Sequence, residues 1–530
     1  MSRPPFTPED DRQMAELGIA PEEAARQVEL FRNPPPFTRV LRPCRPGDGI
    51  RRLSPGEEPA LTARYREAAA VGEVRKFVPA SGAATRMFKP LQSYLDRLEE
   101  AGGEPEPQPP EEVATFFANL RRFAFFEELA ASLARSGQTL GPAALAGGPL
   151  QGEERHAVLR HLLSGQGIAL AERPKGLIPF HRYPSGPRTA FEEHLVEAAA
   201  YGRDARGVCH VHFTVSPQHE AAFAELLEAR RPFLEGHCAA HFEVSFSHQR
   251  RSTDTLAVDP DHRPFRLQDG SLLFRPGGHG ALIENLGELA REGGALVLLK
   301  NIDNVLPESR QPPAVRWKEL AGGCLLALRD QAFDYLGRLE AGEGPPRSLL
   351  EEAGRFLERE LSRPLPRRCA AASPEELRRF LIDALDRPLR VAAVVRNLGE
   401  PGGGPFWVEA ATGEVSPQIV ETSQIHPHEP EQQAALDAAT HFNPADIACA
   451  LLDRHGRPYD LSRFIDPATV FIAPKSHEGR PLKALERPGL WNGAMAGWNT
   501  AFLEVPVATF APVKTILDLL RPEHQEQQPA

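Results

Sequence analysis

Apolar residues recur along this chain in two patterns, every second residue in short segments and every third or fourth residue in longer ones. Segments in which apolar residues alternate or run continuously predict strands. The first of them begins at Val74, and the others lie at 174–183, 208–216, 242–249, 294–303, 389–397, 469–473 and 500–514. Helical spacing prevails between many of them. Strands that alternate with helices in this way indicate an α/β fold with a mainly parallel sheet flanked by helices.

Local start and stop signals bound several of the expected helices. Thr7 with Pro8 is expected to begin a first helix, and Gly18 to end it. Thr189 and Glu192 have the spacing of a capping box ahead of another helix. These signals predict helix boundaries from residues only a few positions apart.

The same patterns divide the chain into regions. We expect an N-terminal helical segment, an α/β core with a helical insert, a second helical insert, a C-terminal part of the core and a disordered polar tail. The corresponding ranges are 1–70, 71–305 with its insert at about 91–172, 306–388, 389–520 and 521–530. We interpret the inserts, one of them rich in Phe, as packing or dimer surfaces.

Composition narrows the classes of partner. Lys and Arg total 61 and Asp and Glu total 72 among 530 residues, which gives a formal net charge of −11. This balance repels nucleic acid and anionic lipid in general, although a local cationic pocket stays compatible with it. The six cysteines form no CxxC pair, so neither a disulfide framework nor a zinc ribbon is indicated.

The distribution of apolar residues also bears on location. The first residues, MSRPPFTPEDDRQ, lack the apolar core of a signal peptide, and no apolar run approaches the ~20 residues that span a bilayer. We therefore expect a cytoplasmic, globular protein without a membrane partner.

A run of small residues follows the first predicted strand of the core. The segment VPASGAATRM places Ser81, Gly82, Ala83 and Ala84 before Thr85 and Arg86. A helix that begins there would direct free N–H groups at an anion, and small residues would let phosphates approach the main chain. It is not a Walker A motif, because no GK[ST] follows. The alternative is an ordinary tight strand-to-helix junction.

Three further positions are candidates for chemistry. Lys175 stands in PKG before a strand, RPGGHG at 275–280 is a second Gly-rich turn, and Asp303 follows a buried apolar strand. Ligands of open α/β sheets collect at the carboxyl ends of strands, where a carboxylate could bind a metal ion. The alternatives are a surface charge for Lys175 and a turn cap for Asp303. If Asp303 is a metal ligand, Asp303→Asn is expected to leave the metal-free melting temperature unchanged or slightly higher.

Two H-x-H pairs make a zinc site conceivable. They are His210 with His212 and His426 with His428. No third ligand stands at a diagnostic spacing, so a zinc site is not our expectation.

The order of these motifs is more informative than any one of them. It resembles that of the UDP-sugar pyrophosphorylases, a family of sugar-1-phosphate nucleotidyltransferases whose loop runs A-G-G-x-G-T-R-L before a PKG. ASGAATRM matches this loop with Ser81 and Ala84 in place of two glycines, and the insert before Pro174 is a second departure. IVETSQI, HFNPADIACAL and FAPVKTILDLL, at 419–425, 441–451 and 510–520, resemble later parts of the family.

A closer resemblance is to a bacterial family catalogued as domain of unknown function 4301. The phrases that carry it are PGDGI near the N-terminus, KGLIPFHRY, and KSHEGRPLKALERPGLWNGAMAGWNT. By this resemblance we identify the chain as a member of that family and a distant relative of the pyrophosphorylases.

The resemblance implies a GT-A-like (Rossmann-like) nucleotidyltransferase core and a definite reaction. In that reaction a sugar 1-phosphate attacks a nucleoside triphosphate, with uridine as the base that the resemblance implies and Mg²⁺ or another divalent cation as cofactor. Homo-oligomerisation stays open. The resemblance implies nucleotide-binding residues Ser81, Gly82, Ala83, Ala84, Thr85, Gly277, Gly278 and His279, catalytic Arg86, Lys175 and Lys514, sugar-binding Glu421 and Asn443, and metal-binding Asp303.

Two rival functions remain at this point. A GT-A glycosyltransferase would consume a nucleotide sugar, but it usually carries a D-x-D motif where this chain has NIDN. A non-catalytic relative that binds a nucleotide or a sugar is suggested by Ser81 and Ala84. Arg86, Lys175, Asp303 and Lys514 favour the enzyme over this rival.

Overall fold

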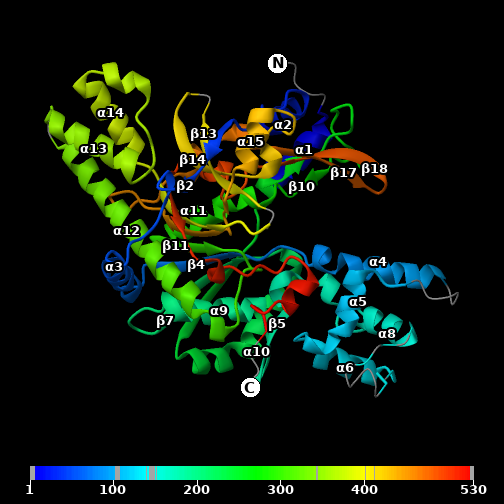
Figure 1. Cartoon of the computed structure of the whole chain (residues 1–530). Helices are drawn as coiled ribbons and strands as arrows, with labels where there is room; N and C mark the ends of the chain where they lie inside the picture. The colour runs from blue at the N-terminus through cyan, green and yellow to red at the C-terminus, as the bar shows by residue number, and fades with distance from the viewer. Residues whose placement is uncertain are drawn as a thin grey trace. The chain divides into compact units, whose positions relative to one another are not determined.

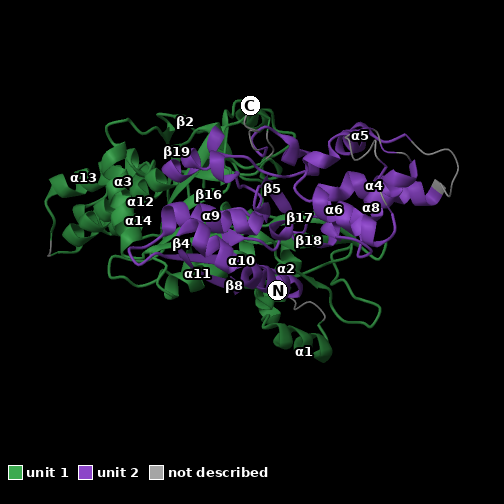
Figure 2. Cartoon of the chain, turned by 90° about the horizontal axis from the view of Figure 1, so that it is seen from below, with its two compact units in different colours: residues 1–77, 247–299, 318–507 green, residues 78–246, 300–317, 508–530 purple. Residues whose placement is uncertain are grey.

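The computed structural model describes residues 6–525 except 102–107, 139, 142–147, 149, 151, 342–343, 400–401 and 411 (Figure 1). The chain forms two compact units (Figure 2): unit 1 comprises residues 1–77, 247–299 and 318–507, and unit 2 comprises residues 78–246, 300–317 and 508–530. The chain passes between them within β4 (Val74–Pro79), β8 (His241–Ser247), β11 (Leu296–Lys300) and α12 (Pro312–Glu340), and again after Val507.

Unit 1 is built on a sheet with the strand order β2-β3-β19-β12-β16-β11-β4. The pairs β2–β3, β3–β19, β19–β12 and β11–β4 are parallel, whereas β12–β16 is antiparallel. The strands not yet bounded are β2 (Arg45–Pro46), β3 (Gly49–Arg51), β12 (Leu389–Arg396), β16 (Asp446–Ala450) and β19 (Asn499–Glu504). β11 and β12 are buried almost throughout, as their continuous apolar sequences predict. The predicted α/β class with a mainly parallel sheet is confirmed.

Smaller sheets and helices complete unit 1. β1 (Val40–Pro43), β13 (Gly404–Glu409) and β14 (Val415–Val420) form one sheet, and β9–β10 and β17–β18 form two-stranded ones. The further strands are β9 (Thr255–Leu256), β10 (Phe274–Arg275), β15 (His441–Phe442), β17 (Phe471–His477) and β18 (Arg480–Glu486). The helices are α1 (Pro8–Leu17), α2 (Pro21–Arg32), α3 (Glu58–Ala70), α11 (Ile283–Arg291), α13 (Arg347–Arg359), α14 (Pro374–Leu385) and α15 (Pro430–Asp437).

Unit 2 combines strands with two groups of helices. Its strands are β5 (Pro179–Tyr183) and β6 (Gly186–Thr189), which form a hairpin, and the neighbours β7 (Val208–Thr214) and β8. α9 (Ala190–Gly202) and α10 (Glu220–Cys238) belong to this part. α4 (Thr85–Ala101), α5 (Glu111–Ala118), α6 (Phe126–Arg135) and α8 (Gly152–Leu163) pack together (Figure 1).

The Phe-rich insert is held together by its own aromatic core. Phe116, Phe123 and Phe125 are fully or almost fully buried, with ring centroids 5.2 Å apart for the first two and 5.1 Å for the last two. Aromatic pairs at such distances add attraction beyond the burial of their surface. The Phe side chains therefore serve packing within unit 2.

The predicted helix signals operate as expected. Thr7 and Asp10 form a capping box at α1, Gly18 ends that helix with a φ of 72°, and Thr189 with Glu192 caps α9. The interpretation of residues from Arg521 on as a disordered tail needs correction, because His524 is only 2% exposed. A histidine surrounded by protein keeps this end ordered through Gln525, and residues 526–530 lie outside the described part.

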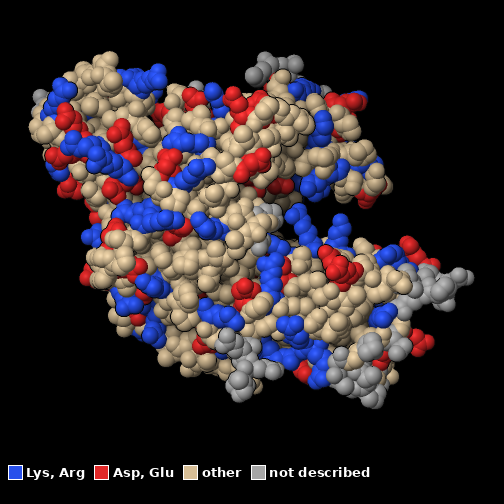
Figure 3. Space-filling view, in the orientation of Figure 1, with Lys and Arg blue, Asp and Glu red and all other residues tan. Residues whose placement is uncertain are grey.

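Surface charge and hydropathy agree with the composition. Acidic and basic side chains are interspersed on the face in Figure 3, so the net charge of −11 does not make that face uniformly acidic. No helix in the described part of the chain is both long enough and apolar enough to cross a bilayer.

Candidate functional site

One carboxylate and two lysines meet in unit 2. Asp303 lies just beyond β11, Lys175 in the short 3-10 helix Lys175–Leu177 before β5, and Lys514 near the C-terminus. The Nζ atoms of Lys175 and Lys514 donate to Oδ2 of Asp303 at 2.8 and 3.1 Å. The side chains of Asp303 and Lys175 are 9% and 12% exposed, whereas that of Lys514 is 49% exposed. Lys514 is thus the member of this cluster with most access to solvent.

The electrostatics of the cluster keep Asp303 ionised. Burial alone would raise the pKa of its carboxyl, but the charges and hydrogen bonds of Lys514 and Lys175 outweigh burial and hold the pKa below 3.8. Two lysines against one carboxylate leave an excess of positive charge. Oδ1 of Asp303 is buried and has no hydrogen-bond partner. The cluster therefore offers positive charge to an anion and a free carboxylate oxygen to a cation.

Backbone contacts fix the C-terminal segment against Asp303. The Val513 N–H donates to the Asp303 carbonyl at 2.9 Å, and Lys175 Nζ donates to the Val513 carbonyl at 2.9 Å. The Ala511 N–H donates to Oδ1 of Asn304 at 3.1 Å. Residues more than 200 positions apart are thereby joined at the turn that carries Asp303.

Helix α9 braces the same turn from another side. Glu197 accepts a hydrogen bond of 2.5 Å from Nζ of Lys300, and both side chains are 1% exposed. Nε2 of His194 donates to the carbonyls of Asn301 and Ile302 at 3.1 and 3.2 Å. A buried ion pair and two carbonyl contacts hold the three residues before Asp303, which limits the movement of its carboxylate.

The predicted phosphate loop lies against the PKG segment. The Lys175 N–H donates to the Gly82 carbonyl at 3.1 Å, and the Ala84 N–H to the Arg173 carbonyl at 3.4 Å. Gly82, Thr85 and Arg86 are exposed. A Cβ on Gly82 would meet nothing within 4 Å, so packing does not require glycine there. The loop and Lys175 are therefore adjacent, with open space beside the main chain.

Gly277 and Gly278 of RPGGHG are required by the local structure of unit 1. A Cβ on Gly277 would come within 2.6 Å of the Thr253 carbonyl oxygen, and Gly278 has a φ of +77°. His279 stacks on Trp491 with 4.2 Å between ring centroids, and its Nδ1 accepts from the Leu490 N–H at 3.0 Å. Burial lowers the pKa of His279 to about 4, so its ring is neutral at pH 7.

The two predicted sugar-binding residues also have partners in unit 1. Nδ2 of Asn443 donates to the Ala393 carbonyl at 2.7 Å, and its Oδ1 accepts from the Ala445 N–H at 3.0 Å. The side chain of Glu421 caps a short helix at 422–424. The structure thus joins Lys175, Asp303, Lys514 and the loop within unit 2, while the other predicted site residues belong to unit 1: Gly277, Gly278, His279, Glu421 and Asn443.

Sequence patterns did not reveal the bracing residues of α9. His194 and Glu197, like Glu192 and Glu193, are buried in a helix with many apolar residues, and four titratable side chains in such a helix are the signal that was present. Among the described residues no group of three or more His, Cys, Asp or Glu could hold a metal ion. His212 instead contacts Ser245 Oγ at 2.8 Å and His210 contacts Glu243 at 2.9 Å.

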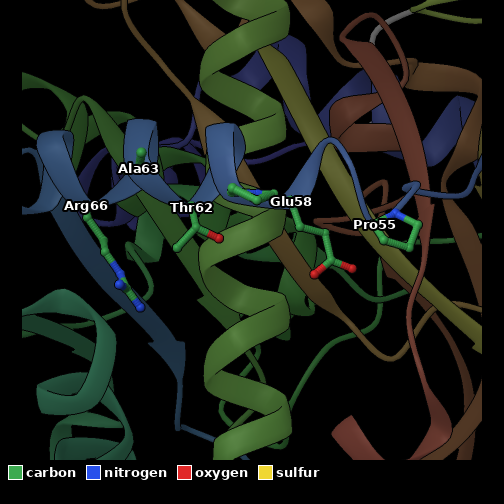
Figure 4. A pocket seen from close by; sticks show the side chains of 6 residues that line it. Pro55, Glu58, Thr62, Ala63 and Arg66 are labelled. Carbon is green, nitrogen blue, oxygen red and sulfur yellow. The ribbon is translucent and has the colours of Figure 1, made fainter.

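A hollow of about 530 Å³ lies on α3 in unit 1, but it has no link to this chemistry (Figure 4). It is lined by Pro55, Glu58, Pro59, Thr62, Ala63 and Arg66. Arg66 donates to both carboxylate oxygens of Glu319 at 3.0 Å. None of the predicted site residues lines this hollow, so it supports no substrate assignment.

Comparison with known proteins gives a family and a set of structural neighbours. The sequence model of a family described as "Domain of unknown function (DUF4301)" matches residues 7–525. No curated protein sequence matches the chain. UDP-N-acetylglucosamine pyrophosphorylase from Trypanosoma brucei aligns with a TM-score of 0.49 and 14% identity, covering 97% of this chain and 79% of that one.

Two further solved structures align over similar shares of the chain. For UDP-glucose pyrophosphorylase from Leishmania major the TM-score is 0.44 and the identity 13%, with 96% of this chain and 77% of that chain covered. For UDP-glucose phosphorylase from Trypanosoma brucei they are 0.44 and 12%, with 97% and 80% covered.

Proposed function

The chain belongs to the family described as Domain of unknown function (DUF4301), and we propose that it is a nucleotidyltransferase that makes a nucleoside diphosphate sugar and pyrophosphate. Its substrates are a nucleoside triphosphate, with uridine as the expected base, and a sugar 1-phosphate. The observation that carries the proposal is the cluster of Asp303, Lys175 and Lys514, which lies in unit 2 together with an exposed loop of small residues.

The reaction brings together two anions that repel each other. An oxygen of the sugar phosphate forms a bond to the α-phosphorus, and the bond from that phosphorus to the bridging oxygen breaks, so that pyrophosphate leaves with the electron pair. Catalysis then depends on alignment and on fixed positive charge more than on covalent protein chemistry. Lys175 is assigned to the nucleotide phosphates and the more exposed Lys514 to the sugar phosphate.

The exposed loop is assigned to the triphosphate. A helix N-terminus carries partial positive charge, and α4 begins at Thr85 directly after the loop. Gly82 and Ala83 leave the main chain accessible, and Arg86 supplies a fork of N–H donors. Of the two residues that replace glycines of the pyrophosphorylase loop, Ala84 is fully buried and so faces the core, whereas Ser81 is exposed.

A divalent cation fits the donors of this cluster. Mg²⁺ is commonly held by one or two carboxylates together with substrate phosphates, and the buried Oδ1 of Asp303 has no other partner. When bound there, the ion would supply neutralisation of charge on the phosphate oxygens. Lys175 and Lys514 would transfer their hydrogen bonds from Oδ2 to phosphate oxygens when the substrates arrive.

The assignments in unit 1 complete the proposal. Gly277, Gly278 and His279 are assigned to the base, and Glu421 and Asn443 to sugar hydroxyls. These roles rest on the resemblance of the sequence motifs, because the polar atoms described for Asn443 and for Nδ1 of His279 already have protein partners.

The decisive experiment measures pyrophosphate release by the purified protein. We expect release from UTP only when Mg²⁺ and a suitable sugar 1-phosphate from a broad panel are both present. Lys175→Met should abolish most of this activity, whereas Lys475→Met, at an exposed lysine on β17, should not affect it. No release with any sugar, combined with no nucleotide binding by calorimetry, would contradict the proposal and favour a non-catalytic relative.

A further inference from the structure

The C-terminal segment, residues 508–525 of unit 2, is held near both of its ends. At one end, Ala511 and Val513 bond to Asn304 and Asp303, as described above. Between the two ends, Val513, Ile516 and Leu519 are buried in the core of unit 2. The second attachment is His524, within the region that the sequence led us to expect as disordered.

His524 ends in a buried row of hydrogen-bonded side chains. Its Nδ1 lies 2.9 Å from Nε2 of His181 on β5, so that one ring donates and the other accepts. Nδ1 of His181 lies 2.8 Å from Oε1 of Glu193 on α9, and the Tyr183 hydroxyl donates to the same oxygen at 2.6 Å. His524, His181 and Glu193 are 2%, 1% and 0% exposed. Two nearly coplanar rings, with 5.3 Å between their centroids and 16° between their planes, thus attach the segment to β5 and, through Glu193, to α9.

The stretch between the two attachments is compact. Oδ2 of Asp518 accepts from the N–H groups of Lys514 and Thr515, both at 2.7 Å, and a short 3-10 helix covers Ile516–Leu520. If His524 were displaced, this compact stretch would therefore move and would displace the backbone of Lys514. Chain ends fray unless they are tied down. The side chain of Lys514 is 49% exposed and bonds to Asp303 at 3.1 Å, so its position depends on its backbone.

We propose that His524 is a positioning residue: it anchors the C-terminal segment to His181 and Glu193 and thereby holds Lys514 beside Asp303. The inference deepens the proposed function, on which it rests only for the assignment of Lys514 to phosphate. The anchoring itself is a property of unit 2 and has readouts that need no substrate.

The test uses four altered full-length or shortened proteins. His524→Phe keeps a planar ring but removes both nitrogens, and His524→Asn keeps a polar group near the place of Nδ1. A chain that ends at Pro522 lacks His524, and its matched control ends at Gln525 and keeps it. Two readouts follow the segment: hydrogen exchange of the peptide that contains Ala511 and Val513, and the rate at which an amine reagent modifies Lys514.

We expect exchange at Ala511 and Val513 to become about tenfold faster or more in His524→Phe and in the chain ending at Pro522, since local opening would cost less. Modification of Lys514 should accelerate in the same two proteins. The chain ending at Gln525 should behave as the full chain does, and His524→Asn should lie between. If pyrophosphate release is detected, KM for the sugar 1-phosphate should rise more than kcat falls.

Three results would overturn the inference. Unchanged exchange at Ala511 and Val513 would mean that the core contacts suffice to hold the segment. An equal rise in exchange throughout α9 would make His524 a general core residue. Faster exchange without any change in Lys514 modification or in KM would separate the segment from the site. A protein without catalytic activity still gives the first two readouts, so failure of the proposed function is distinguishable.

Discussion

The predicted site residues of the two units differ in what their polar atoms do. In unit 2, Oδ1 of Asp303 has no hydrogen-bond partner, and nearly half of the Lys514 side chain is exposed. In unit 1, both polar atoms of the Asn443 amide bond to the main chain, and Nδ1 of His279 accepts from Leu490. A polar group that already bonds to a buried partner has less hydrogen-bonding capacity left for a ligand. Motif resemblance treats these residues alike, whereas their contacts favour ligand binding in unit 2.

We expect the largest effect at Asp303, where a substitution tests most directly whether the site in unit 2 binds ligands. Asp303→Asn keeps the shape but removes the charge, and we expect turnover in the pyrophosphate assay to fall by ~10²-fold or more. The sequence alone led us to expect an unchanged or higher melting temperature. The structure corrects this, because Asp303 is the counter-ion of Lys175 and Lys514.

The loss of these bonds should lower the metal-free stability of Asp303→Asn by about 1–3 kcal/mol in urea unfolding. Lys514→Met is the control, since its removal leaves Lys175 as a partner of the carboxylate and should cost little stability. An Asp303→Asn protein that is as stable and as active as the unaltered chain would exclude both the metal role and the ion-pair role.

The loop offers the next largest effect. Arg86→Ala should weaken UTP binding by ~1.5–3 kcal/mol, and Gly82→Val should obstruct the approach of phosphate to the main chain. Because a Cβ on Gly82 meets no atom within 4 Å, folding should be unaffected. Calorimetry with UTP and with uridine makes the measurement. Gly165→Val is the control, at another exposed glycine with free space.

Equal losses of affinity for UTP and uridine in the loop variants would show that the loop is a structural junction. A loss of affinity for UTP alone would instead indicate that the triphosphate binds at the loop in unit 2.

A substitution at Asn443 tests whether this residue of unit 1 has a structural role. Asn443→Ala should lower the free energy of unfolding by about 1–3 kcal/mol, because the Ala393 carbonyl and the Ala445 N–H lose their partner. The amide also supports a turn in which Ala445 has a φ of +54°, an uncommon conformation for a residue other than glycine. Urea unfolding gives the stability. Lower affinity for a sugar 1-phosphate at unchanged stability would instead indicate that Asn443 binds the substrate.

The smallest effect concerns pH. Burial lowers the pKa of His279 from 6.5 to about 4, so the folded state disfavours its protonation. Its contribution to stability is complete above about pH 6.5 and is lost as the pH falls toward 4. Between pH 7 and pH 5 we expect a loss of at most about 2 kcal/mol from this group. His279→Phe should show a correspondingly weaker dependence of unfolding free energy on pH, and an unchanged dependence would mean that other groups cause it.

Much of the local structure could be predicted from the sequence. The partners of the capping box, Thr189 and Glu192, are only three positions apart, and a glycine such as Gly18 ends a helix because it adopts a positive φ without strain. The apolar run from Leu296 to Leu299 specified a buried strand and placed Asp303 shortly after its end. Each of these inferences depends on residues that are close in the chain, where covalent geometry limits the alternatives.

The contacts of the site depend on the tertiary structure. Lys175 and Asp303 are 128 positions apart, and Lys514 is 211 positions beyond Asp303. No local spacing could therefore predict that both lysines donate hydrogen bonds to the same oxygen atom of Asp303. The same holds for His524, which is flanked by polar residues and reads as part of a tail until His181 and Glu193 exclude water from it. Local sequence patterns predicted several of the strands and the ends of helices such as α1 and α9, but not every strand: the strand expected over 500–514 is β19, which ends at Glu504. Only tertiary packing decided which charged groups became partners, because that depends on elements brought together across the whole chain.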